Sequence, residues 1–446
     1  MTHRPRLSAL QQIVLGYVVI ILAGALLLQL PAASANARSQ PFLDTLFCAT
    51  SAVTTTGLTV VDIGSAYSPF GELVILVLFQ IGGLGYMLLL AGILTGLGGK
   101  LSLSSRVLLR ESMARPPRVD MLTYGRFIVG LTLVVELTGT LGLAWLFSAD
   151  CPAPEALYSG FFHAVSAFCT AGFGLYADSL SGFRQSAAIQ LVIHVLMGLG
   201  ALGFLVIHDL VAGNLRGAGG RREKLSMQSR LVLKTSLCLA VGGTILVWLG
   251  NRLLPTAGGP LGQQWLDASF QALSAATTTG FYTLDIGHLP MATLWVLIAL
   301  MFIGASPGGS GGGIKTLSLA LLGAYLRDHL AGRADTVVGG SRISPLLLNK
   351  VLALVSLALL WIILATGVLL FTEEADLAGL LFEVVSALGT VGLSTGLTAD
   401  LTPFGKSLIL LTMLAGRVGP LVLGYSLFRR NRKEHYSYPE ADLALG

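Results

Sequence analysis

Four short motifs rich in small and hydroxyl-bearing residues recur along the chain, and each ends in glycine. They read SAVTTTG (51–57), SAFCTAG (166–172), SAATTTG (274–280) and SALGTVG (386–392). The intervals between their final glycines are 115, 108 and 112 residues. Four similar intervals across one chain indicate an internal repeat. Threonine hydroxyls and backbone carbonyls are groups that can replace the water around a dehydrated cation.

If the four motifs meet at one axis, their last residues form rings of oxygen ligands. Glycine suits such a site because it adopts backbone angles that turn a carbonyl inward, and the C-terminal end of a short preceding helix favours a cation. The alternative is that the motifs are small-residue stretches that pack helices together. Four equally spaced copies disfavour this alternative. The predicted filter residues are Thr54, Thr55, Thr56, Gly57, Cys169, Thr170, Ala171, Gly172, Thr277, Thr278, Thr279, Gly280, Gly389, Thr390, Val391 and Gly392.

An acidic residue follows each motif within a few positions. These residues are Asp62, Asp178, Asp285 and Asp400. An acidic mouth raises the local concentration of cations. Ordinary solvated loop charge is the alternative interpretation.

The composition is that of an integral membrane protein. Of 446 residues, 54% are hydrophobic and only 11% are charged, against about 25% charged in a typical soluble domain. Two long apolar segments flank each motif, and most exceed the ~20 residues that cross the hydrocarbon core as a helix. The segment that leads into each motif has about a dozen residues and is too short to span. The long segments are 12–30 and 69–94, 126–147 and 187–211, 231–250 and 291–326, and 348–371 and 405–428.

We therefore predict an all-α membrane protein of four covalently linked repeats with pseudo-fourfold symmetry, like a potassium channel. Each repeat is a helix, a re-entrant pore hairpin and a second helix, because irregular backbone at membrane depth must be buried in protein or line a cavity. The predicted repeats span residues 1–99, 100–215, 216–335 and 336–446, the last with a short C-terminal tail. Each second helix is predicted to break at glycine, and the breaks are Gly82-Gly83, Gly198, Gly304 and Gly416.

The basic residues predict which side of the membrane each loop occupies. Of 28 Lys and Arg, 22 lie in the N-terminus, the loops 95–126, 212–234 and 327–350, and the C-terminus. The positive-inside rule then places both termini in the cytoplasm and opens the hairpins outward. A cleaved signal peptide is disfavoured because the apolar run at 13–30 is longer than a signal core. No separate basic arm suggests nucleic-acid binding.

The second long segment of the third repeat is interrupted by GASPGGSGGGIKT (304–316). Glycine costs a helix about 1 kcal/mol and proline about 3 kcal/mol relative to alanine, so this stretch must be irregular. At mid-membrane it needs a cavity, and we predict a loop directly below the filter that obstructs the pore. The predicted gate residues are Gly304, Ser306, Pro307, Gly308, Gly309, Ser310, Gly311, Gly312, Gly313, Lys315 and Arg417.

Two enzymatic motifs overlap this loop. GGIKT is similar to a phosphate-binding loop, but that pattern has Gly directly before Lys, whereas Ile314 intervenes here. GGSG fits an intramembrane serine protease, but a catalytic serine needs a base within reach, and the histidines of the chain lie elsewhere. No catalytic residue is predicted.

Three further polar residues interrupt apolar segments. A central Arg costs about 2.5–3.5 kcal/mol on insertion scales, so it usually faces a cavity or a partner. Arg417 is predicted in the cytoplasmic half of the pore beside the glycine-rich loop, where it repels cations or hydrogen-bonds loop carbonyls; a snorkelling arginine is the alternative. Glu136 and His194 are interpreted as interhelical hydrogen-bonding groups, with a proton or ion relay as the alternative.

At these residues the chain resembles the Trk/Ktr/HKT superfamily of potassium transporters. The filter motifs, the glycine-rich loop and GRVGPL (416–421) carry the resemblance, which covers nearly all of residues 10–430. Within the superfamily the chain is most similar to the KtrB family, the membrane subunits of Ktr systems, because its first repeat begins within a few residues of the N-terminus. The second motif departs from the others in having Cys169 where they have Thr or Gly. Gly57 is intact, which in this superfamily implies potassium selectivity.

The resemblance implies potassium uptake across the bacterial cytoplasmic membrane, gated by the glycine-rich loop, with no enzymatic activity. K+ is then the transported ion, Na+ an activator, and no organic cofactor binds this chain. It further implies a homodimer and a cytosolic ring of nucleotide-binding, KtrA-like regulatory subunits. The alternatives are a Trk- or HKT-type K+/Na+ transporter and a cation-coupled secondary solute transporter. The latter class often has inverted repeats, whereas these four repeats are parallel.

Overall fold

The computed structural model describes residues 9–85, 121–214, 225–252 and 259–419, and the statements below concern these residues. The N-terminal arginines, most of the basic loop 95–126, residues 215–224 of the basic loop 212–234, and the C-terminal tail lie outside them. So do the predicted repeat boundaries near 99 and 215.

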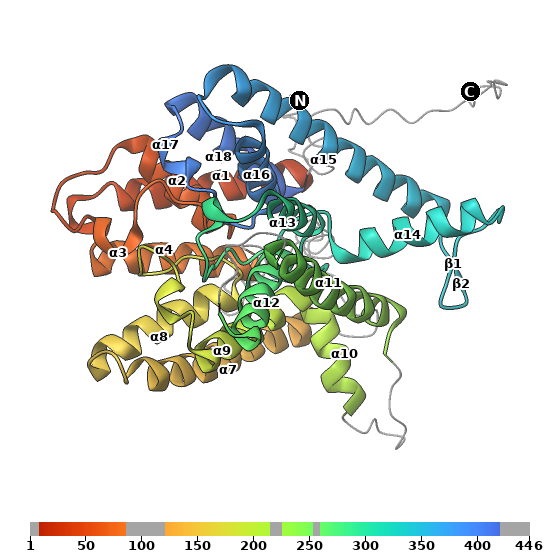
Figure 1. Cartoon of the computed structure of the whole chain (residues 1–446), viewed down its shortest axis with the longest axis horizontal. Coiled ribbons are helices and arrows are strands. Elements are labelled where there is room, and N and C mark those ends of the chain that lie inside the picture. The colour runs from red at the N-terminus through yellow and green to blue at the C-terminus, as the bar shows by residue number, and fades with distance from the viewer. Residues whose placement is uncertain (1–8, 86–120, 215–224, 253–258, 420–446) are drawn as a thin grey trace, which may run out of the picture.

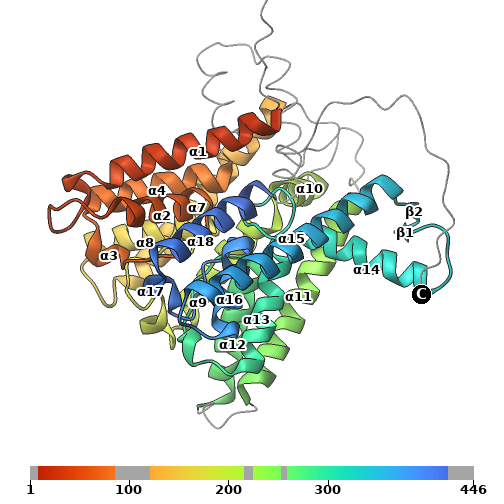
Figure 2. The ribbon, with the colours of Figure 1, turned by 90° about the horizontal axis from the view of Figure 1, so that it is seen from above.

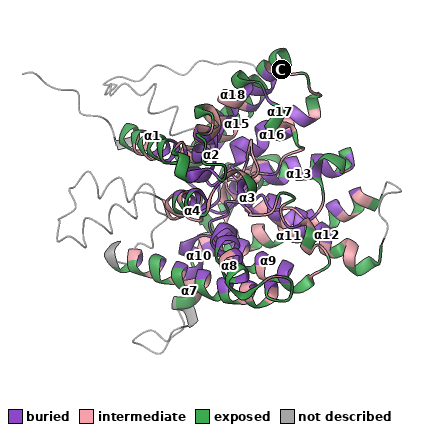
Figure 3. Ribbon diagram, turned by 90° about the vertical axis from the view of Figure 1, so that its left-hand side faces the viewer, coloured by how far each residue is buried: buried purple, intermediate pink, exposed green. Residues whose placement is uncertain are grey.

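Four long helices form the outside of the molecule. They are α1 (Ala9–Leu28), α7 (Met121–Phe147), α11 (Met227–Arg252) and α15 (Pro345–Thr372), and all four are long and apolar enough to cross a membrane. Their outer faces leave large apolar side chains exposed, such as Leu133, Trp145 and Ile363. Figure 3 shows exposed residues along the helices at the periphery and buried residues toward the centre. Such faces are suited to lipid.

Four short helices point into the centre and end at the glycine motifs. They are α2 (Phe42–Val53), α8 (Ala153–Phe168), α12 (Leu261–Thr277) and α16 (Leu377–Gly389). Proline precedes the first three, where its missing N–H costs no hydrogen bond. Asp376 caps α16 by accepting a hydrogen bond from the Gly379 N–H. We call these the pore helices.

Four inner helices follow the motifs, and each ends at a glycine with positive φ. They are α4 (Pro69–Leu84), α9 (Ala187–Leu202), α13 (Met291–Ile303) and α18 (Pro403–Val418). The terminating glycines are Gly85 (φ 80°), Gly203 (89°), Gly304 (73°) and Gly419 (92°). The predicted break at Gly304 is therefore correct, whereas those at Gly82-Gly83, Gly198 and Gly416 are wrong, because these glycines lie inside helices.

Three of the glycines inside the inner helices serve close packing instead. A Cβ on Gly82 would lie 2.2 Å from Val53 O, and one on Gly416 would lie 2.1 Å from Leu388 O. A Cβ on Gly200 would lie 1.9 Å from Phe168 O. Three of the four inner helices, α4, α9 and α18, thus rest directly on the last carbonyls of a pore helix. In the sequence, Gly82 and Gly416 but not Gly200 are singled out, and they are mistaken for helix breaks because close packing and a helix break both require glycine.

In two of the predicted long segments the inner helix ends, and the chain then continues into a second helix. After Gly203 the chain turns by 98° into α10 (Phe204–Asn214). After α13 the loop 304–315 leads to α14 (Thr316–Leu330). A two-stranded hairpin, β1 (Val337–Val338) and β2 (Ser341–Arg342), follows α14. The short helices η1 (Pro31–Ala33), α3 (Ile63–Ala66), η2 (Ser181–Phe183), η3 (Ile286–His288) and α17 (Leu397–Asp400) lie in the connections.

The hairpin is held to α14 by one buried carboxylate. Asp328 accepts hydrogen bonds from the Val337 N–H (2.9 Å), from Arg327 (2.9 and 3.0 Å) and from Arg333 (3.1 Å). These donors, Arg327 first, hold the pKa of Asp328 at about 2. The carboxylate therefore stays ionised throughout the physiological range.

The outer, pore and inner helices form four units arranged in a ring. Unit 1 is α1, α2 and α4, unit 2 is α7, α8 and α9, unit 3 is α11, α12 and α13, and unit 4 is α15, α16 and α18. The inner helix of each unit contacts the pore helix of the next: α4 with α8, α9 with α12, α13 with α16, and α18 with α2. Figure 1 shows the chain passing around a common centre from red to blue, and Figure 2 shows the same helices from above. The predicted all-α membrane fold is confirmed.

The close packing of α9 gives a stability prediction with a matched control. We expect Gly200→Ala to lower the thermal unfolding temperature, because overpacking against the Phe168 carbonyl costs about 1–3 kcal/mol. Gly198→Ala, two residues away, meets no atom within 4 Å and should be neutral or stabilising by up to about 1 kcal/mol. Thermal unfolding of the detergent-purified variants measures both. Equal unfolding temperatures for the two variants would contradict the packing.

Candidate functional site

The four motifs adopt the same irregular backbone. The threonine two positions before each final glycine has left-handed φ. These residues are Thr55 (52°), Thr170 (50°), Thr278 (57°) and Thr390 (49°). The final glycines, at 57, 172, 280 and 392, also have positive φ, between 68° and 92°. Left-handed threonine is uncommon. Its occurrence at one register in all four motifs shows that the hairpins are built alike.

The N–H groups of each motif turn back to their own pore helix. Thr56 N–H donates to Ser51 O at 2.8 Å, and the same bond recurs in the other three motifs at 2.8–2.9 Å. Gly57 N–H donates to Ser51 Oγ at 3.0 Å, and the glycines at 280 and 392 do the same with Ser274 and Ser386, both at 3.1 Å. In three of the four copies, this hydrogen bond explains why the motif opens with serine.

The carbonyls of the motifs are left free of these bonds. In the described part of the chain, no hydrogen bond is donated to a carbonyl oxygen of the sixteen predicted filter residues. Nearly all buried carbonyls in proteins have a partner. A set of buried carbonyls without protein donors is therefore available for a cation.

The four motifs meet in a closed ring. A Cβ on Gly57 would lie 2.5 Å from Ala171 O, and one on Gly172 would lie 2.1 Å from Thr279 O. A Cβ on Gly280 would lie 2.2 Å from Val391 O. The fourth contact closes the cycle, because a Cβ on Gly392 would lie 2.1 Å from Thr56 O. All sixteen predicted filter residues are thus brought to one place, in chain order, with no room for a side chain at the glycines.

A polar cavity of about 270 Å³ opens on one side of this ring. All four motif glycines line it, and so do Asp62 and Asp285. Asp178 and Asp400, the other two predicted acids, do not line it, although their chain neighbours do. Two of the four acids therefore face the approach to the ring.

The glycine-rich loop 304–315 lies on the opposite side, against the left-handed threonines. Thr55 Oγ1 donates to Ser310 O (3.3 Å), and Thr170 Oγ1 donates to Ser310 Oγ (3.2 Å). Gly312 N–H donates to Thr278 Oγ1 at 3.2 Å. The fourth threonine is equally close, since a Cβ on Gly312 would lie 2.1 Å from Thr390 Oγ1. The loop therefore crosses directly beneath all four motifs.

The loop is anchored on the break between α9 and α10. Ser310 Oγ donates to Phe168 O (3.0 Å) and Gly200 O (3.1 Å). Ser306 N–H donates to Ala201 O at 3.0 Å. In return, Phe204 N–H donates to a loop carbonyl, that of residue 308, at 3.0 Å. The predicted gate residues 304 to 315 form one continuous segment at this place.

Arg417 joins this loop to unit 1. Its Nη1 donates to Ser310 O and, at 2.9 Å, to Thr55 Oγ1. Its Nη2 donates to Gly82 O. A second cation is close, because Lys315 Nζ donates to the carbonyl of Gly311. The guanidinium lies beside the loop as the sequence predicts, and its role in gating stays a prediction.

Glu136 lies behind the second motif. Gln80 Nε2 donates to Glu136 Oε1 at 2.9 Å, and Cys169 Sγ donates to Gln80 Oε1 at 3.1 Å. Cys169 thus uses its side chain to contact two neighbouring helices, which explains the departure of this motif. His194 Nδ1 bonds Gln190 O at 2.6 Å within α9. The interhelical hydrogen bond predicted for Glu136 is present.

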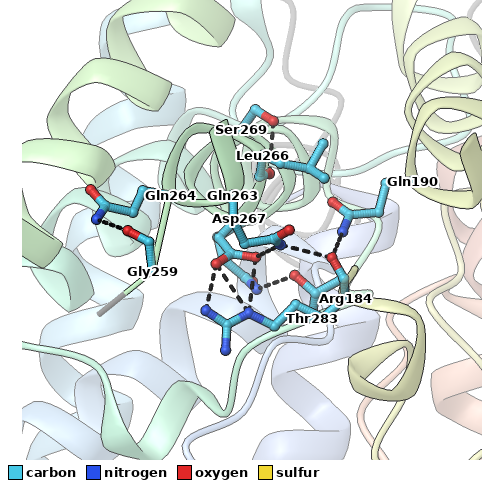
Figure 4. Close-up of polar contacts among 10 residues, drawn as sticks. Arg184, Gln190, Gly259, Gln263, Gln264, Leu266, Asp267, Ser269 and Thr283 are labelled. Atoms are coloured by element: carbon cyan, nitrogen blue, oxygen red, sulfur yellow. Dashed lines mark hydrogen bonds and ion pairs between the residues drawn. The ribbon is translucent and has the colours of Figure 1, made fainter. Parts of the chain in front are cut away.

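Polar pairs tie neighbouring units together at the end of the molecule where the pore helices begin. The pairs are Tyr158 with Glu72 at 2.5 Å, Arg184 with Asp267 at 2.7 Å, and Lys406 with Asp44 at 3.4 Å. Figure 4 shows Arg184 facing Asp267, with Gln263 donating to both residues at 2.8 and 2.9 Å. These ties connect units 1 and 2, 2 and 3, and 4 and 1, which are three of the four joins in the ring.

One set of residues was overlooked in the sequence. Six positions before the first filter residue, each pore helix carries Cys48, His163, Gln271 or Glu383. The signal was available, because these positions repeat at the interval of the motifs. Residue type differs in all four copies, which concealed the shared register.

Comparison with known proteins decides the family. The family model described as TrkH, cation transport protein, matches residues 9–435. The chain belongs to the TrkH family of cation transport proteins. It is 33% identical over 99% of its length to the potassium/sodium uptake protein NtpJ of Enterococcus hirae, of which it covers 98%. It is 34% identical over 97% of its length to the Ktr system potassium uptake protein B of Vibrio alginolyticus, of which it covers 94%.

A solved TrkH structure supports the fold. The crystal structure of the potassium transporter TrkH from Vibrio parahaemolyticus aligns with a TM-score of 0.72 and 22% identity, over 95% of this chain and 86% of that one. At this identity the match concerns the fold alone. Together with the family match, it confirms a multi-pass membrane transporter rather than an enzyme.

The closed ring predicts a cation-dependent stability. Gly280→Ala places a Cβ 2.2 Å from Val391 O and strains a residue with φ of 89°. Ligands that bind only the folded state stabilise it, by about 2.7 kcal/mol at 100 times Kd. We expect K+ or Rb+ to raise the unfolding temperature of the wild type above its value in Na+, and Gly280→Ala to abolish this difference.

Gly182→Ala is the control for this experiment. It lies in η2 and its Cβ would meet no atom within 4 Å. It should keep the cation-dependent difference. A difference that persists in Gly280→Ala would show that the ring is not where the cation binds.

Proposed function

We propose that this chain takes up potassium across the bacterial cytoplasmic membrane, down its electrochemical gradient, through the ring of motif carbonyls. The observation that carries the proposal is the cyclic closure of the four glycines on the carbonyls of the next motif. The names of the relatives, potassium/sodium uptake protein and Ktr system potassium uptake protein B, support it. The sixteen predicted filter residues then form the selectivity filter.

The filter replaces the hydration shell of the ion. Backbone N–H groups are engaged with the pore helix, so each motif directs carbonyl oxygens toward the shared axis. The C-terminal ends of four pore helices add partial negative charge at the same place. Asp62 and Asp285 raise the cation concentration in the cavity in front of it. An ion enters from this cavity and is dehydrated stepwise in the ring.

The loop 304–315 and Arg417 form the gate. An ion that leaves the filter meets the segment around Ser310. This segment forms hydrogen bonds with Thr55 of unit 1, with Thr170 of unit 2 and with the Gly200 carbonyl of α9. Arg417 and Lys315 place positive charge directly behind it. Conduction therefore requires these hydrogen bonds to break and the loop to move aside. Because Ser310 Oγ is committed to carbonyls, this geometry favours a gate over a protease nucleophile.

Regulation by other subunits completes the proposal. In this proposal a homodimer of the chain binds a cytosolic ring of nucleotide-binding, KtrA-like subunits, and the similarity to Ktr system potassium uptake protein B supports such a partner. The basic segments that the positive-inside rule assigns to the cytoplasm have a charge suited to docking such a ring. Na+ then acts as an activator. The NtpJ name favours a second candidate, uptake of both K+ and Na+.

Rubidium uptake into proteoliposomes tests the proposal. The wild type should accumulate Rb+, and external K+ should compete at lower concentration than Na+ or Li+. Equal competition by K+ and Na+ would favour the K+/Na+ transporter. Rb+ entry that depends on an added organic solute would overturn the proposal in favour of a secondary transporter.

Removing the guanidinium of Arg417 should open the gate. A hydrogen bond to a charged group is worth about 1.5–3 kcal/mol, so we expect Arg417→Ala to speed Rb+ uptake by about tenfold or more. Arg342→Ala is the control, because this exposed arginine pairs with the exposed Asp335 in the β-hairpin region. An uptake rate in Arg417→Ala equal to that of the control would rule out the gating role.

A further inference from the structure

Six positions before the first filter residue, side chains of the pore helices contact the chain segment that leaves the filter. Cys48, His163, Gln271 and Glu383 are all buried, with at most 1% of each residue exposed. They come from four different helices, α2, α8, α12 and α16. Three of them accept hydrogen bonds from the backbone shortly after the motif glycine.

Glu383 makes the most extensive set of these contacts. Its Oε1 accepts the Thr395 N–H at 3.0 Å and the Ser394 hydroxyl at 2.6 Å. Its Oε2 accepts the Thr398 hydroxyl at 2.6 Å. A buried carboxylate is retained only when donors satisfy it, and here every donor belongs to the segment that follows Gly392. The carboxylate therefore fixes this segment against its own pore helix.

His163 and Gln271 do the same in units 2 and 3. His163 Nδ1 faces Ser159 O at 2.8 Å, so it carries the hydrogen, and Nε2 is left to accept the Leu175 N–H at 3.4 Å. In the amide orientation that satisfies both of its ends, Gln271 Oε1 accepts the N–H groups of Thr283 and Leu284, each at 3.0 Å.

The bonded N–H groups share a register as well. Leu175, Thr283 and Thr395 each lie three residues beyond the motif glycine of their unit. Three chemically different side chains thus perform one task at one place. The motif serines hold the filter strand where it leaves the helix, and these acceptors hold it three residues after the glycine.

We propose that His163, Gln271 and Glu383 are positioning residues that set the ion selectivity of the filter by fixing the strand that leaves it. The inference rests on the proposed function, because it concerns the same ring of carbonyls. A carbonyl can point to the axis only if the peptide on either side of it is held. Loss of the outer anchor lets the strand rotate, and a widened or uneven ring discriminates poorly between K+ and Na+.

Unit 1 supplies the internal control. Cys48 occupies the register but packs in an apolar cluster with Tyr67 and Phe79. Within the described residues no hydrogen bond joins Cys48 to the backbone that follows Gly57. Cys48→Ala should therefore leave selectivity unchanged, although the residue is as buried as the other three.

The experiment compares alanine, conservative and control variants of the full chain in proteoliposomes. The readout is the ratio of the Na+ and K+ concentrations that halve Rb+ uptake, with the unfolding temperature measured in parallel. We expect His163→Ala and Glu383→Ala to lower this ratio by about tenfold. His163→Gln should retain it, because glutamine serves the same register in unit 3.

A milder variant decides the case if the alanine variants do not fold. Gln271→Met keeps the side-chain volume and removes the acceptor, and it should lower the ratio as His163→Ala does. Unchanged ratios in Gln271→Met and in the folded alanine variants, with a selective wild type, would overturn this inference alone. A wild type that does not discriminate between K+ and Na+ would overturn the proposed function instead.

Discussion

The structure depends on one constraint: irregular backbone in an apolar interior must place every N–H group on a protein acceptor. The motifs meet this constraint by turning their N–H groups back to the end of the pore helix and to the serine at its last turn. Their carbonyls are consequently directed away from the helix. Four copies in a ring then present these oxygens to one another, and a cation bound among them, as proposed, would relieve the resulting repulsion.

The same backbone accounts for the position of the loop beneath the ring. Thr55 and its three counterparts have left-handed φ two positions before each glycine, and the side chains of all four contact the loop. The filter and the loop are therefore coupled through hydroxyl groups. Arg417 contacts both Thr55 and Ser310. A displacement of the loop at Ser310 therefore changes the hydrogen bonding of Thr55 in the first motif.

The repeat of the motifs and their shared backbone were readable from the sequence because their chemistry is local. Four equally spaced glycine motifs predict four like backbones, and six glycines and a proline within 304–315 preclude a regular helix. The helix ends were not readable in the same way. Gly82, Gly200 and Gly416 are required by a neighbouring helix, and a sequence does not distinguish a glycine that ends a helix from one that admits a carbonyl.

The polar register of the pore helices was missed for a related reason. His163, Gln271 and Glu383 share a role as acceptors but no common residue type. Their partners are backbone N–H groups, which leave no mark on the sequence. Position relative to the motif, rather than composition, was the informative quantity.

Anomalous diffraction from crystals grown in rubidium chloride tests the central claim most directly. We expect a rubidium peak on the axis shared by the carbonyl oxygens of Thr56, Ala171, Thr279 and Val391, and its loss when sodium replaces rubidium. Rubidium bound only at the periphery, or a ring without any peak, would contradict the account.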